Sequence, residues 1–592
     1  MTNNLRIVLS YLLAGLCFAA YPAALDAARG TPVISGSLKP VGQPEFHRAE
    51  LVTVANQPFA KAWRVQVLSK TEHTYEVQLQ AASQAPVKQG DTLLVTLYVR
   101  CLDSRDETGE GRVEVVFENN RAPHAKSLAA PVAIGRDWQP ITRAFKAGES
   151  YGLGQAQLYV ACGFYPQTLE IGGVTLQNLG PNADPKPYQT NEYAYDGQRL
   201  DAPWRKQAEA RIERLRKGDL RVEVTDRAGR PMANADVQVR MLRHEFGFGS
   251  IVTSKLITEE SPNAAKYRAT VLRLYNKVVF ENDLKWQGWE NPDNQAQTLR
   301  ALHWLQTNNL AVRGHCLVWP SWKNLPGDLR GLSRDPAAVR QRIADHITQE
   351  VGAVRGRIVE WDVLNEPYIN HDVMDLLGKD IMVDWFKLAR QADPKPKLYI
   401  NDFSILSAEG RDTKHQAHYE QTIKFLKDSG APIAGIGMQS HFGTQATAPT
   451  RMLQILDRFG AFGLEIQGTE HDIDTTDEQF QADFTRDYLT VMFSHPAVVG
   501  VLSWGFWEGH HWRPNGAYFR KDWSVKPAGQ VWMDLTLKQW WTDERGKTGS
   551  TGMYPVRGFL GQYEITATVN GKKAVLQAAL PRQGATVRVV ME

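Results

Sequence analysis

Two acidic residues attract attention because each ends an apolar run that is typical of a buried strand. Glu366 follows the run Trp361-Asp-Val-Leu-Asn365 and precedes Pro367, which cannot continue a hydrogen-bonded strand. Glu470 ends a second run of this kind, more than 100 residues later. A carboxyl kept protonated can act as a general acid, and an ionised one as a nucleophile or base. A lone acid at a strand end also fits a structural role, so the prediction depends on the pair.

The elements that would position these acids form a regular series between residues 243 and 541. Helix-like segments alternate with eight apolar runs that predict strands, at Phe246–Val252, Lys277–Glu281, Ala311–Trp319, Ile358–Glu366, Lys397–Phe403, Ile433–His441, Leu464–Asp472 and Val499–Trp507. Eight strand–helix units over this length predict a (β/α)8 barrel. A doubly wound open sheet is the alternative, but no glycine-rich phosphate loop follows the first strand.

Polar and aromatic side chains gather at the expected carboxyl ends of seven of these strands. They are Glu281, Asn282, Lys285, His315, Trp319, Asn365, Glu366, Asn401, Asp402, Gln439, His441, Glu470, His471, Asp472, Trp504, Trp507 and, in the last loop, Trp512. In a barrel of parallel strands these ends meet at one mouth, which favours an active site over separate contacts to backbone. Two carboxyls facing each other there are what hydrolysis of a glycosidic bond requires, and their separation decides between retention and inversion.

The motifs in this region resemble glycoside hydrolase family 10, the retaining endo-β-1,4-xylanases. The resemblance covers about half of the chain and all eight expected strands. It rests on Phe280-Glu-Asn-Asp-Leu-Lys285-Trp286, Arg313-Gly-His-Cys-Leu-Val-Trp319, Trp361-Asp-Val-Leu-Asn-Glu366-Pro367, Tyr399-Ile-Asn-Asp402, Gln439-Ser-His441 and Thr469-Glu-His-Asp-Ile473.

The resemblance implies a role for each matching residue. Glu366 would be the acid/base and Glu470 the nucleophile of a double displacement on xylan, with no metal or cofactor. Asn365 would bind the 2-hydroxyl of the reacting sugar. Gln439 would support Glu366, while His441, backed by Asp472, would hold Glu470. The reacting sugar would lie among Lys285, His315, Trp319, Trp504 and Trp512, and the next sugar would reach Glu281 and Asn282.

Three departures from the family pattern weaken the inference to ordinary xylan. His471 replaces the apolar residue that usually follows the nucleophile, and we expect it to be buried and hydrogen-bonded. Pro320-Ser321-Trp322 replaces the usual His-Ser-Gln, and the loop Glu508–Pro514 also differs. One alternative is therefore the same mechanism on another β-linked glycan or a decorated oligosaccharide. Remoter alternatives are a non-catalytic glycan-binding protein and a metal-dependent hydrolase that uses His315, His441 and His471.

The rest of the chain predicts further domains. Residues 1–27 resemble a signal peptide, with Arg6 before an apolar run, and predict export to the periplasm or the medium. Short alternating runs over residues 33–180 predict a β-sandwich that resembles jelly-roll carbohydrate-binding modules; a sandwich that only packs against the next domain is the alternative. Residues 181–217 read as a linker ending in a short helix from Ala208 to Lys217. Residues 218–242 and 542–592 each have too few strands for a core, so we expect one small sandwich split by the barrel.

Composition agrees with a soluble globular protein acting on a neutral substrate. The 592 residues carry a net charge of +3, which gives no reason to expect a nucleic acid or an anionic membrane as partner. Export would allow a Cys101–Cys162 disulfide, whereas Cys316 lies in an apolar run and predicts a buried thiol. Cys17 follows Leu16, which is larger than lipoprotein cleavage sites normally accept. The oligomeric state is left open.

Overall fold

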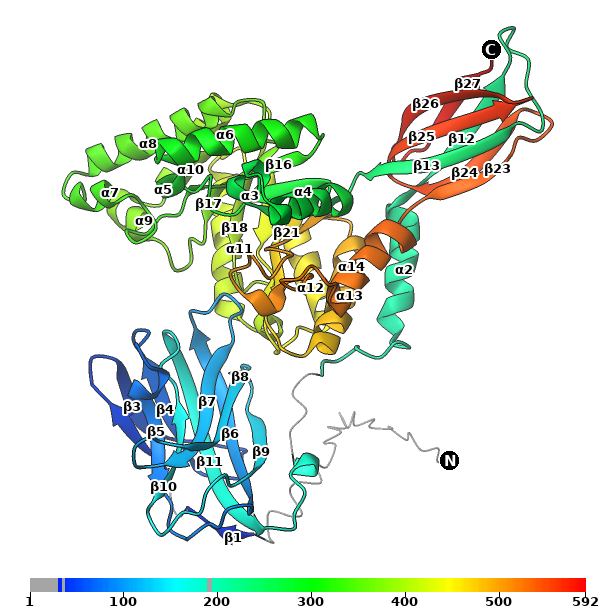
Figure 1. Ribbon diagram of the computed structural model, residues 1–592. Coiled ribbons are helices and arrows are strands. Elements are labelled where there is room, and N and C mark those ends of the chain that lie inside the picture. Colours follow the sequence, from blue (N-terminus) through cyan, green and yellow to red (C-terminus); the bar gives the residue numbers. More distant parts are fainter. Residues whose placement is uncertain (1–29, 35–37, 189–193) are drawn as a thin grey trace, which may run out of the picture. The chain divides into compact units, whose positions relative to one another are not determined.

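A computed structural model describes residues 30–34, 38–188 and 194–592 (Figure 1). The expected signal peptide and Cys17 therefore lie outside the described residues. The chain divides into two compact units. One contains residues up to Leu102 with Arg112–Val132 and Asp137–Thr190, and the other contains Asp103–Gly111, Ala133–Arg136 and Asn191–Glu592. Within the described residues, no helix is both long enough and apolar enough to span a membrane.

The first unit is built from two antiparallel sheets, as the alternating sequence pattern predicts. One sheet has the order β3-β4-β11-β6-β9, with β1 beside β11, and the other has the order β2-β5-β10-β7-β8. Phe117 of β7 and Phe145 of β9 pack across the two sheets, with ring centroids 5.6 Å apart. The strands are β1 (Thr31–Pro32), β2 (Lys39–Gly42), β3 (His47–Thr53), β4 (Lys61–Val67), β5 (Val77–Ala82), β6 (Thr92–Ser104), β7 (Gly111–Asn119), β8 (Lys126–Ile134), β9 (Gln139–Lys146), β10 (Ala156–Ala161) and β11 (Gln167–Gly180).

The cysteines of this unit do not form the bond that the sequence allows. Cys101 and Cys162 are both buried, and neither is bonded to the other. Burial raises the pKa of the Cys162 thiol to about 12, because the apolar surroundings disfavour the thiolate. Cys316 is a buried thiol in the other unit, as predicted.

The second unit contains a closed barrel of eight parallel strands. Neighbouring strands pair in chain order from β14 to β19; β21 then pairs with β19, and β22 pairs with both β21 and β14. The strands are β14 (Gly247–Val252), β15 (Lys277–Phe280), β16 (Ala311–Val318), β17 (Glu360–Asn365), β18 (Lys397–Asp402), β19 (Gly435–Met438), β21 (Glu465–Ile473) and β22 (Val498–Ser503). The predicted (β/α)8 fold is therefore confirmed.

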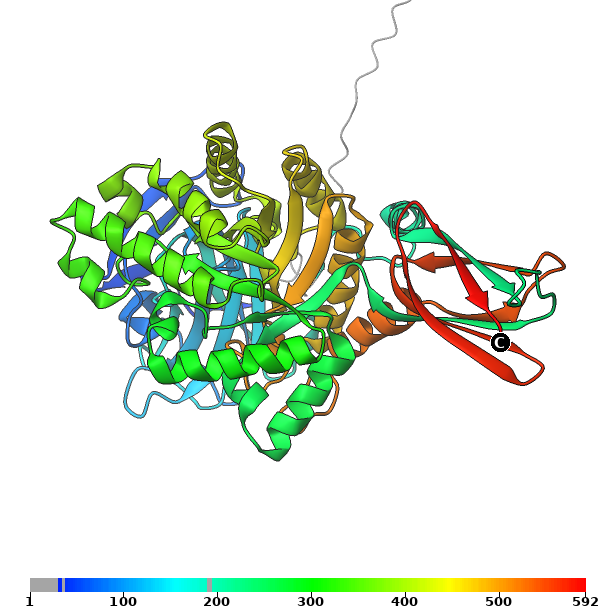
Figure 2. The ribbon, with the colours of Figure 1, turned by 90° about the horizontal axis from the view of Figure 1, so that it is seen from above.

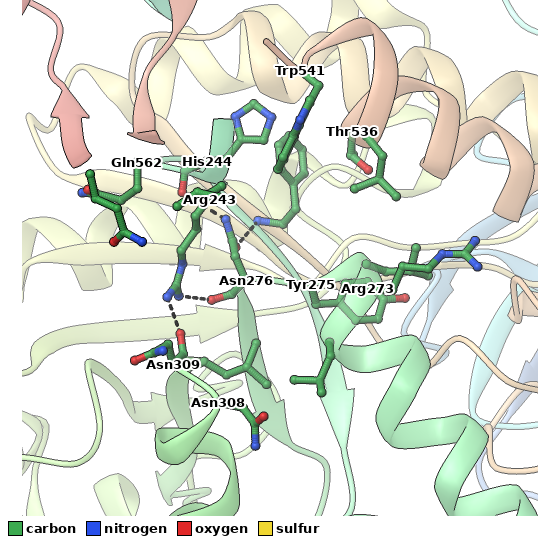
Figure 3. A pocket seen from close by; sticks show the side chains of 17 residues that line it. Arg243, His244, Arg273, Tyr275, Asn276, Asn308, Asn309, Thr536, Trp541 and Gln562 are labelled. Carbon is green, nitrogen blue, oxygen red and sulfur yellow. Dashed lines mark hydrogen bonds between the residues drawn. The ribbon is translucent and has the colours of Figure 1, made fainter. Parts of the chain in front are cut away.

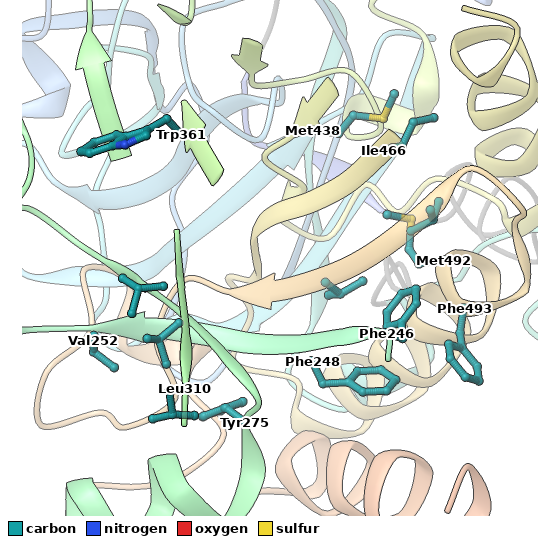
Figure 4. Packing of buried hydrophobic residues seen from close by; sticks show 14 of the residues in the cluster. Phe246, Phe248, Val252, Tyr275, Leu310, Trp361, Met438, Ile466, Met492 and Phe493 are labelled. Carbon is teal, nitrogen blue, oxygen red and sulfur yellow. The ribbon is translucent and has the colours of Figure 1, made fainter. Parts of the chain in front are cut away.

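Helices between the strands cover the outside of the barrel. Several begin with proline in the first turn, where its missing N–H costs no hydrogen bond. In Figure 4, Met438 of β19 and Ile466 of β21 belong to the same buried cluster as Met492. The helices are α3 (Ser254–Thr258), α4 (Pro262–Leu274), α5 (Trp286–Trp289), α6 (Pro292–Thr307), α7 (Gly327–Gly331), α8 (Pro336–Ala353), α9 (Asp372–Leu377), α10 (Ile381–Ala392), α11 (Thr413–Asp428), α12 (Pro449–Gly460), α13 (Glu478–Ser494) and α14 (Pro527–Asp534).

Three elements differ clearly from the sequence prediction. The eighth strand was expected to reach Trp507, but β22 ends at Ser503, so Trp504 and Trp507 lie in the loop that follows. The sixth strand does not run unbroken from Ile433 to His441: β19 ends at Met438, and a two-residue strand, β20 (His441–Phe442), follows. Ser440 lies between them with a φ of +69°, which interrupts the extended backbone. The short helix α2 (Pro203–Leu215) begins before Ala208, at a proline in its first turn, and Lys217 belongs to the next strand.

The predicted split sandwich is confirmed, because segments from both sides of the barrel share its sheets. β12 (Lys217–Thr225) lies between β24 and β27, and β13 (Asp236–His244) lies between β23 and β25. In Figures 1 and 2 these two green strands lie among the orange and red ones. The later strands are β23 (Asp543–Lys547), β24 (Met553–Phe559), β25 (Gly561–Val569), β26 (Lys572–Leu580) and β27 (Ala585–Val590).

Candidate active site

Glu366 lies immediately after β17, where Pro367 ends the strand. Its φ is +52°, a left-handed conformation that is uncommon for residues other than glycine and that clusters at functional sites. Its backbone N–H donates to the carbonyl of Asn401 at 2.8 Å, which ties the turn to the neighbouring strand β18. The residue is only 5% exposed. The backbone therefore holds this side chain at the barrel mouth at the cost of local strain.

The carboxyl of Glu366 is surrounded by hydrogen-bond donors. Gln439 Nε2 donates to Oε1 at 2.8 Å, which is the contact that the family resemblance implies. Trp319 Nε1 donates to Oε2 at 3.0 Å, and Asn370 Nδ2 donates to the same oxygen at 3.1 Å. Asn365 Nδ2 lies 3.3 Å from Oε1. Four side chains from three parts of the chain thus fix the orientation of one carboxyl group.

Glu470 lies on β21 with different partners. Asn401 Nδ2 donates to its Oε1 at 2.8 Å, and His441 Nε2 lies 3.3 Å from Oε2. The Nδ1 atom of His315 is 4.0 Å from Oε1. Asn401 also donates to Asn365 Oδ1 at 2.9 Å. Asn401 therefore links Glu470, the candidate nucleophile, to Asn365, which directly precedes the candidate acid Glu366.

Polar contacts continue from His441 to Asp472 and from Asp472 to Trp512. His441 Nδ1 lies 3.0 Å from Asp472 Oδ1, and Trp512 Nε1 donates to Asp472 Oδ2 at 2.6 Å. Although burial opposes a charged imidazole, the carboxylate of Asp472 raises the pKa of His441 to about 10. The same contact lowers the pKa of the buried Asp472 to about 2. Asp472 thereby keeps His441 protonated and able to donate to Glu470.

The pKa values of the two candidate catalytic carboxyls, Glu366 and Glu470, are shifted in opposite directions. Burial raises the pKa of Glu366, and the negative charges of Glu107 and Glu470 raise it further. Burial also opposes ionisation of Glu470, but His315 and His441 outweigh it and lower the pKa of Glu470. One carboxyl is therefore disposed to hold a proton while its neighbour is ionised, which is the division of roles in glycoside hydrolysis.

The residues expected to line the reacting sugar's position lie close together. Lys285 Nζ is 5.3 Å from the ring centroid of Trp319 and 5.8 Å from that of Trp504. The rings of His315 and Trp504 meet edge to face, with centroids 5.2 Å apart. Trp512, in the loop after β22, is 38% exposed and keeps part of its ring open to solvent. These side chains are placed to form a polar and aromatic surface around the two carboxyls.

The pair expected to reach the next sugar is partly engaged within the protein. Glu281 Oε2 lies 2.8 Å from His510 Nε2, and Asn282 Oδ1 accepts from Lys285 Nζ at 3.0 Å. The hydrogen bond from His510 outweighs burial and lowers the pKa of Glu281. His510 belongs to the loop Glu508–Pro514 that departs from the family pattern, so this departure directly contacts an expected sugar-binding residue.

The other two departures have structural explanations. His471 is buried, as predicted, and its ring stacks on Tyr488 with centroids 4.1 Å apart. The hydrogen bond that was expected with this burial is not found, since neither ring nitrogen has a partner at hydrogen-bonding geometry in the part of the chain that the structure describes. Burial lowers the pKa of His471 to about 4, so the ring is neutral at physiological pH. Trp322 packs partly buried against the main core cluster, and its backbone N–H donates to Asp372 Oδ2 at 2.8 Å. Among the described residues, neither side chain is hydrogen-bonded to Glu366 or Glu470.

Some residues of the site were not predicted. Asn370 follows Glu366 by four residues in a loop, where no periodic pattern marks it. Asp362 lies on β17 and holds both His315 Nδ1, at 2.9 Å, and Arg313 Nε, at 3.1 Å. The strand motif contains Asp362 but assigns it no role. The polar residue amid an otherwise apolar run was the signal that could have identified it.

Comparison with known proteins finds a family match over the same region of the chain. The family described as glycosyl hydrolase family 10 matches residues 239–534, which is half of the sequence. This chain belongs to glycosyl hydrolase family 10. The matched residues contain the whole barrel and every residue of the candidate site described above except Glu107.

The relatives of this chain differ in name and in the share of their own length that matches it. The anti-sigma-I factor RsgI6 of Acetivibrio thermocellus is 32% identical over 62% of this chain and 47% of its own. Endo-1,4-beta-xylanase 1 of Arabidopsis thaliana is 29% identical over 63% of this chain and 38% of its own. The chain thus spans about half or less of the length of these two relatives. Endo-1,4-beta-xylanase 3 of Hypocrea jecorina is 30% identical over 52% of this chain and 89% of its own.

Among solved structures, xylanase 10B from Thermotoga maritima is 26% identical to this family 10 chain. It covers 50% of this chain and 96% of its own, with a TM-score of 0.46.

A separate cavity of about 520 Å³ lies where the small sandwich meets the barrel (Figure 3). Arg243 donates to the backbone carbonyls of Asn276 and Asn309 there, and His244 packs against Trp541 with ring centroids 5.5 Å apart. Its polar groups are thus used to join elements of the protein. It contains none of the residues predicted to do chemistry.

Proposed function

We propose that this family 10 chain is a retaining β-glycoside hydrolase, acting as an endo-1,4-β-xylanase on xylan or a closely related β-glycan. The observation that carries the proposal is the opposite environment of two buried carboxyls. Glu366 is surrounded by neutral donors and neighbouring negative charge, while Glu470 faces His441 and His315. Two acids with pKa values pushed apart are the signature of an acid/base and nucleophile pair.

The first step is attack on the sugar. Glu470 adds to the anomeric carbon while Glu366 gives its proton to the departing glycosidic oxygen, which leaves a glycosyl ester on Glu470. In the second step Glu366, now ionised, takes a proton from water as that water displaces Glu470. Asn401 and His441 stabilise the Glu470 carboxylate before the first step and when it is released.

The substrate class is supported by the names of relatives and by the aromatic side chains in the site. Several relatives carry the name endo-1,4-beta-xylanase. A different β-glycan or a decorated oligosaccharide is the second candidate, because His510 contacts Glu281 and because Trp322 replaces the usual glutamine. A glycan-binding protein without catalysis is the remote alternative.

The remaining assignments are also proposals. The N-terminal sandwich would bind a glycan and keep the barrel near an insoluble substrate. The N-terminal 27 residues would direct export to the periplasm or the medium, where such substrates occur. The substrate would then be the main partner of the mature protein.

A covalent trap tests the proposed mechanism. An activated 2-deoxy-2-fluoro-xylobioside slows hydrolysis of the glycosyl ester, so digestion and mass spectrometry should find one added glycosyl group on the peptide that contains Glu470. No adduct, together with no hydrolysis of any β-glycan tested, would leave only the binding role. Reducing ends released from xylan, mixed-linkage glucan and short xylo-oligosaccharides would then distinguish the two substrate candidates.

A further inference from the structure

The segment Asp103–Gly111, which links β6 to β7, belongs to the same compact unit as the barrel. Asp106 accepts hydrogen bonds from Arg513 Nη2 at 3.2 and 3.3 Å. Glu110 Oε1 accepts from the backbone N–H of Gln445 at 2.7 Å. Gly109 lies so close to Ser404 that a Cβ would be 2.3 Å from its Oγ. The segment therefore contacts the loops that follow β22, β20 and β18.

Glu107 is the residue of this segment that acts on the catalytic groups. Its negative charge raises the pKa of Glu366 and that of His441. Its Oε2 atom is 3.7 Å from Arg513 Nη2 and is buried without a hydrogen-bond partner among the described residues. The side chain as a whole is 31% exposed. This carboxylate thus lies beside the site with unused capacity to accept hydrogen bonds.

A role in holding the segment does not account for Glu107. Asp106 already accepts from Arg513, and Glu110 already anchors the segment to Gln445. Burial raises the pKa of Glu107; the positive charges of His441 and Arg513 oppose this rise, and the negative charges of Asp106 and Glu470 add to it. An unpaired buried acceptor is costly unless a donor reaches it, and sugar hydroxyls are such donors.

We propose that Glu107 contacts the substrate, its carboxylate accepting a hydrogen bond from a hydroxyl of the sugar on the leaving-group side of the scissile bond. The inference rests on the proposed function. The segment lies against the loops after β18, β20 and β22, whereas Glu281 and Asn282, expected to reach the sugar beyond the other side, follow β15. Glu107 also acts on Glu366, the group that protonates the leaving oxygen.

Two substrates separate this contact from catalysis itself. Xylotetraose carries sugars on both sides of the scissile bond, while an aryl β-xylobioside carries no sugar hydroxyl on the leaving side. The activity of each variant on each substrate is measured at the pH optimum of that variant. Glu107→Ala should lower kcat/KM for xylotetraose at least about tenfold, because a hydrogen bond to a charged group is lost. The same variant should change kcat/KM for the aryl glycoside by a clearly smaller factor, because there it alters only the electrostatic environment of Glu366 and His441. Glu107→Gln, which preserves the shape, should show the same selectivity with a smaller loss.

Asp106→Asn is the matched control, because it weakens the other carboxylate contact with Arg513. It should affect both substrates by the same factor. If Glu107→Ala also affects both substrates equally, Glu107 positions the segment and the proposal is wrong. If Glu107→Ala leaves xylotetraose cleavage unchanged, the proposal is wrong while the proposed function stands. If the unmodified protein cleaves neither substrate, the proposed function itself fails.

Discussion

Glu366 and Glu470 have the same side chain, yet their surroundings give them opposite tendencies. The donors around Glu366 are neutral amides and an indole, which bind either protonation state. Glu470 instead faces His441, whose charge is maintained by Asp472. The difference between the two acids therefore originates in their neighbours, mainly in one histidine–aspartate pair.

Removal of either acid should have different consequences for different leaving groups. Glu366→Ala should lower kcat on xylotetraose by about 10³-fold, since general acid catalysis contributes on this order. It should have less effect on the first step with a dinitrophenyl glycoside, whose leaving group needs no proton. Glu470→Ala should abolish turnover of both, because no glycosyl ester can form. The measurement is the initial rate of each variant and of the unmodified protein with xylotetraose and with the dinitrophenyl glycoside.

Glu465→Gln provides the matched control for these variants, since Glu465 begins β21, the strand that carries Glu470. It should leave both activities within about twofold, as expected of a residue distant from the chemistry. Normal turnover of xylotetraose by Glu366→Ala would contradict the assignment of the acid.

The pair of His441 and Asp472 should make stability depend on pH. The pKa of His441 is about 10 in the folded protein and about 6.5 when unfolded. The folded state therefore holds an extra proton between these values. The stabilisation that protonated His441 gives to the folded state is fully present below pH 6.5 and is lost as pH rises toward 10. The free energy of unfolding should fall more steeply over this window in the native protein than in His441→Gln. Urea unfolding followed by tryptophan fluorescence at pH 6, 8 and 9.5 measures both slopes, and equal slopes would contradict the expectation.

At the residue scale, sequence reasoning located the side chains that follow strands. Because strand ends meet at the barrel mouth, the structure brings together Glu366, Glu470, Gln439 and His441. Their roles stay predictions until variants are measured. Asn370 and Glu107 could not be found in this way. They belong to loops, and the path of a loop is not encoded in the periodicity of apolar residues.

At the scale of elements, the eight barrel strands were predicted because buried parallel strands are nearly continuous apolar runs. The break in the sixth strand was not predictable, since Met438-Gln-Ser-His441 contains no proline or glycine. The left-handed φ of Ser440 interrupts it. This break separates Gln439, which binds Glu366, from His441, which binds Glu470.

The split sandwich allows a matched test of core packing. Val239 on β13 is fully buried, while Val575 on β26 is 50% exposed. Val239→Ala should lower the free energy of unfolding by about 2 kcal/mol through lost burial and a small cavity. Val575→Ala should change it by less than about 0.5 kcal/mol. Equal effects in denaturant unfolding would mean that this sandwich does not limit the stability of the chain.

At the scale of the whole molecule, the N-terminal sandwich is expected to bind glycan independently of the barrel. Protein whose Glu470 has been trapped by the 2-fluoro-xylobioside has an occupied active site. It should nevertheless sediment with insoluble xylan to about the same extent as untreated protein, because a second site remains open. Insoluble chitin is the control surface. Loss of xylan binding after trapping would assign all retention to the barrel.

The shared sheets of the small sandwich have a consequence for how the chain is made. β12 and β13 leave the ribosome first, but their partners β23 to β27 lie within the last 50 residues or so. Until translation ends, both strands have edges that lack hydrogen-bond partners, and such edges promote aggregation. A prematurely terminated chain would keep these edges exposed beside an otherwise complete barrel. Closure of the sandwich therefore distinguishes finished molecules from truncated ones, and it gives proteases a physical basis for removing the latter.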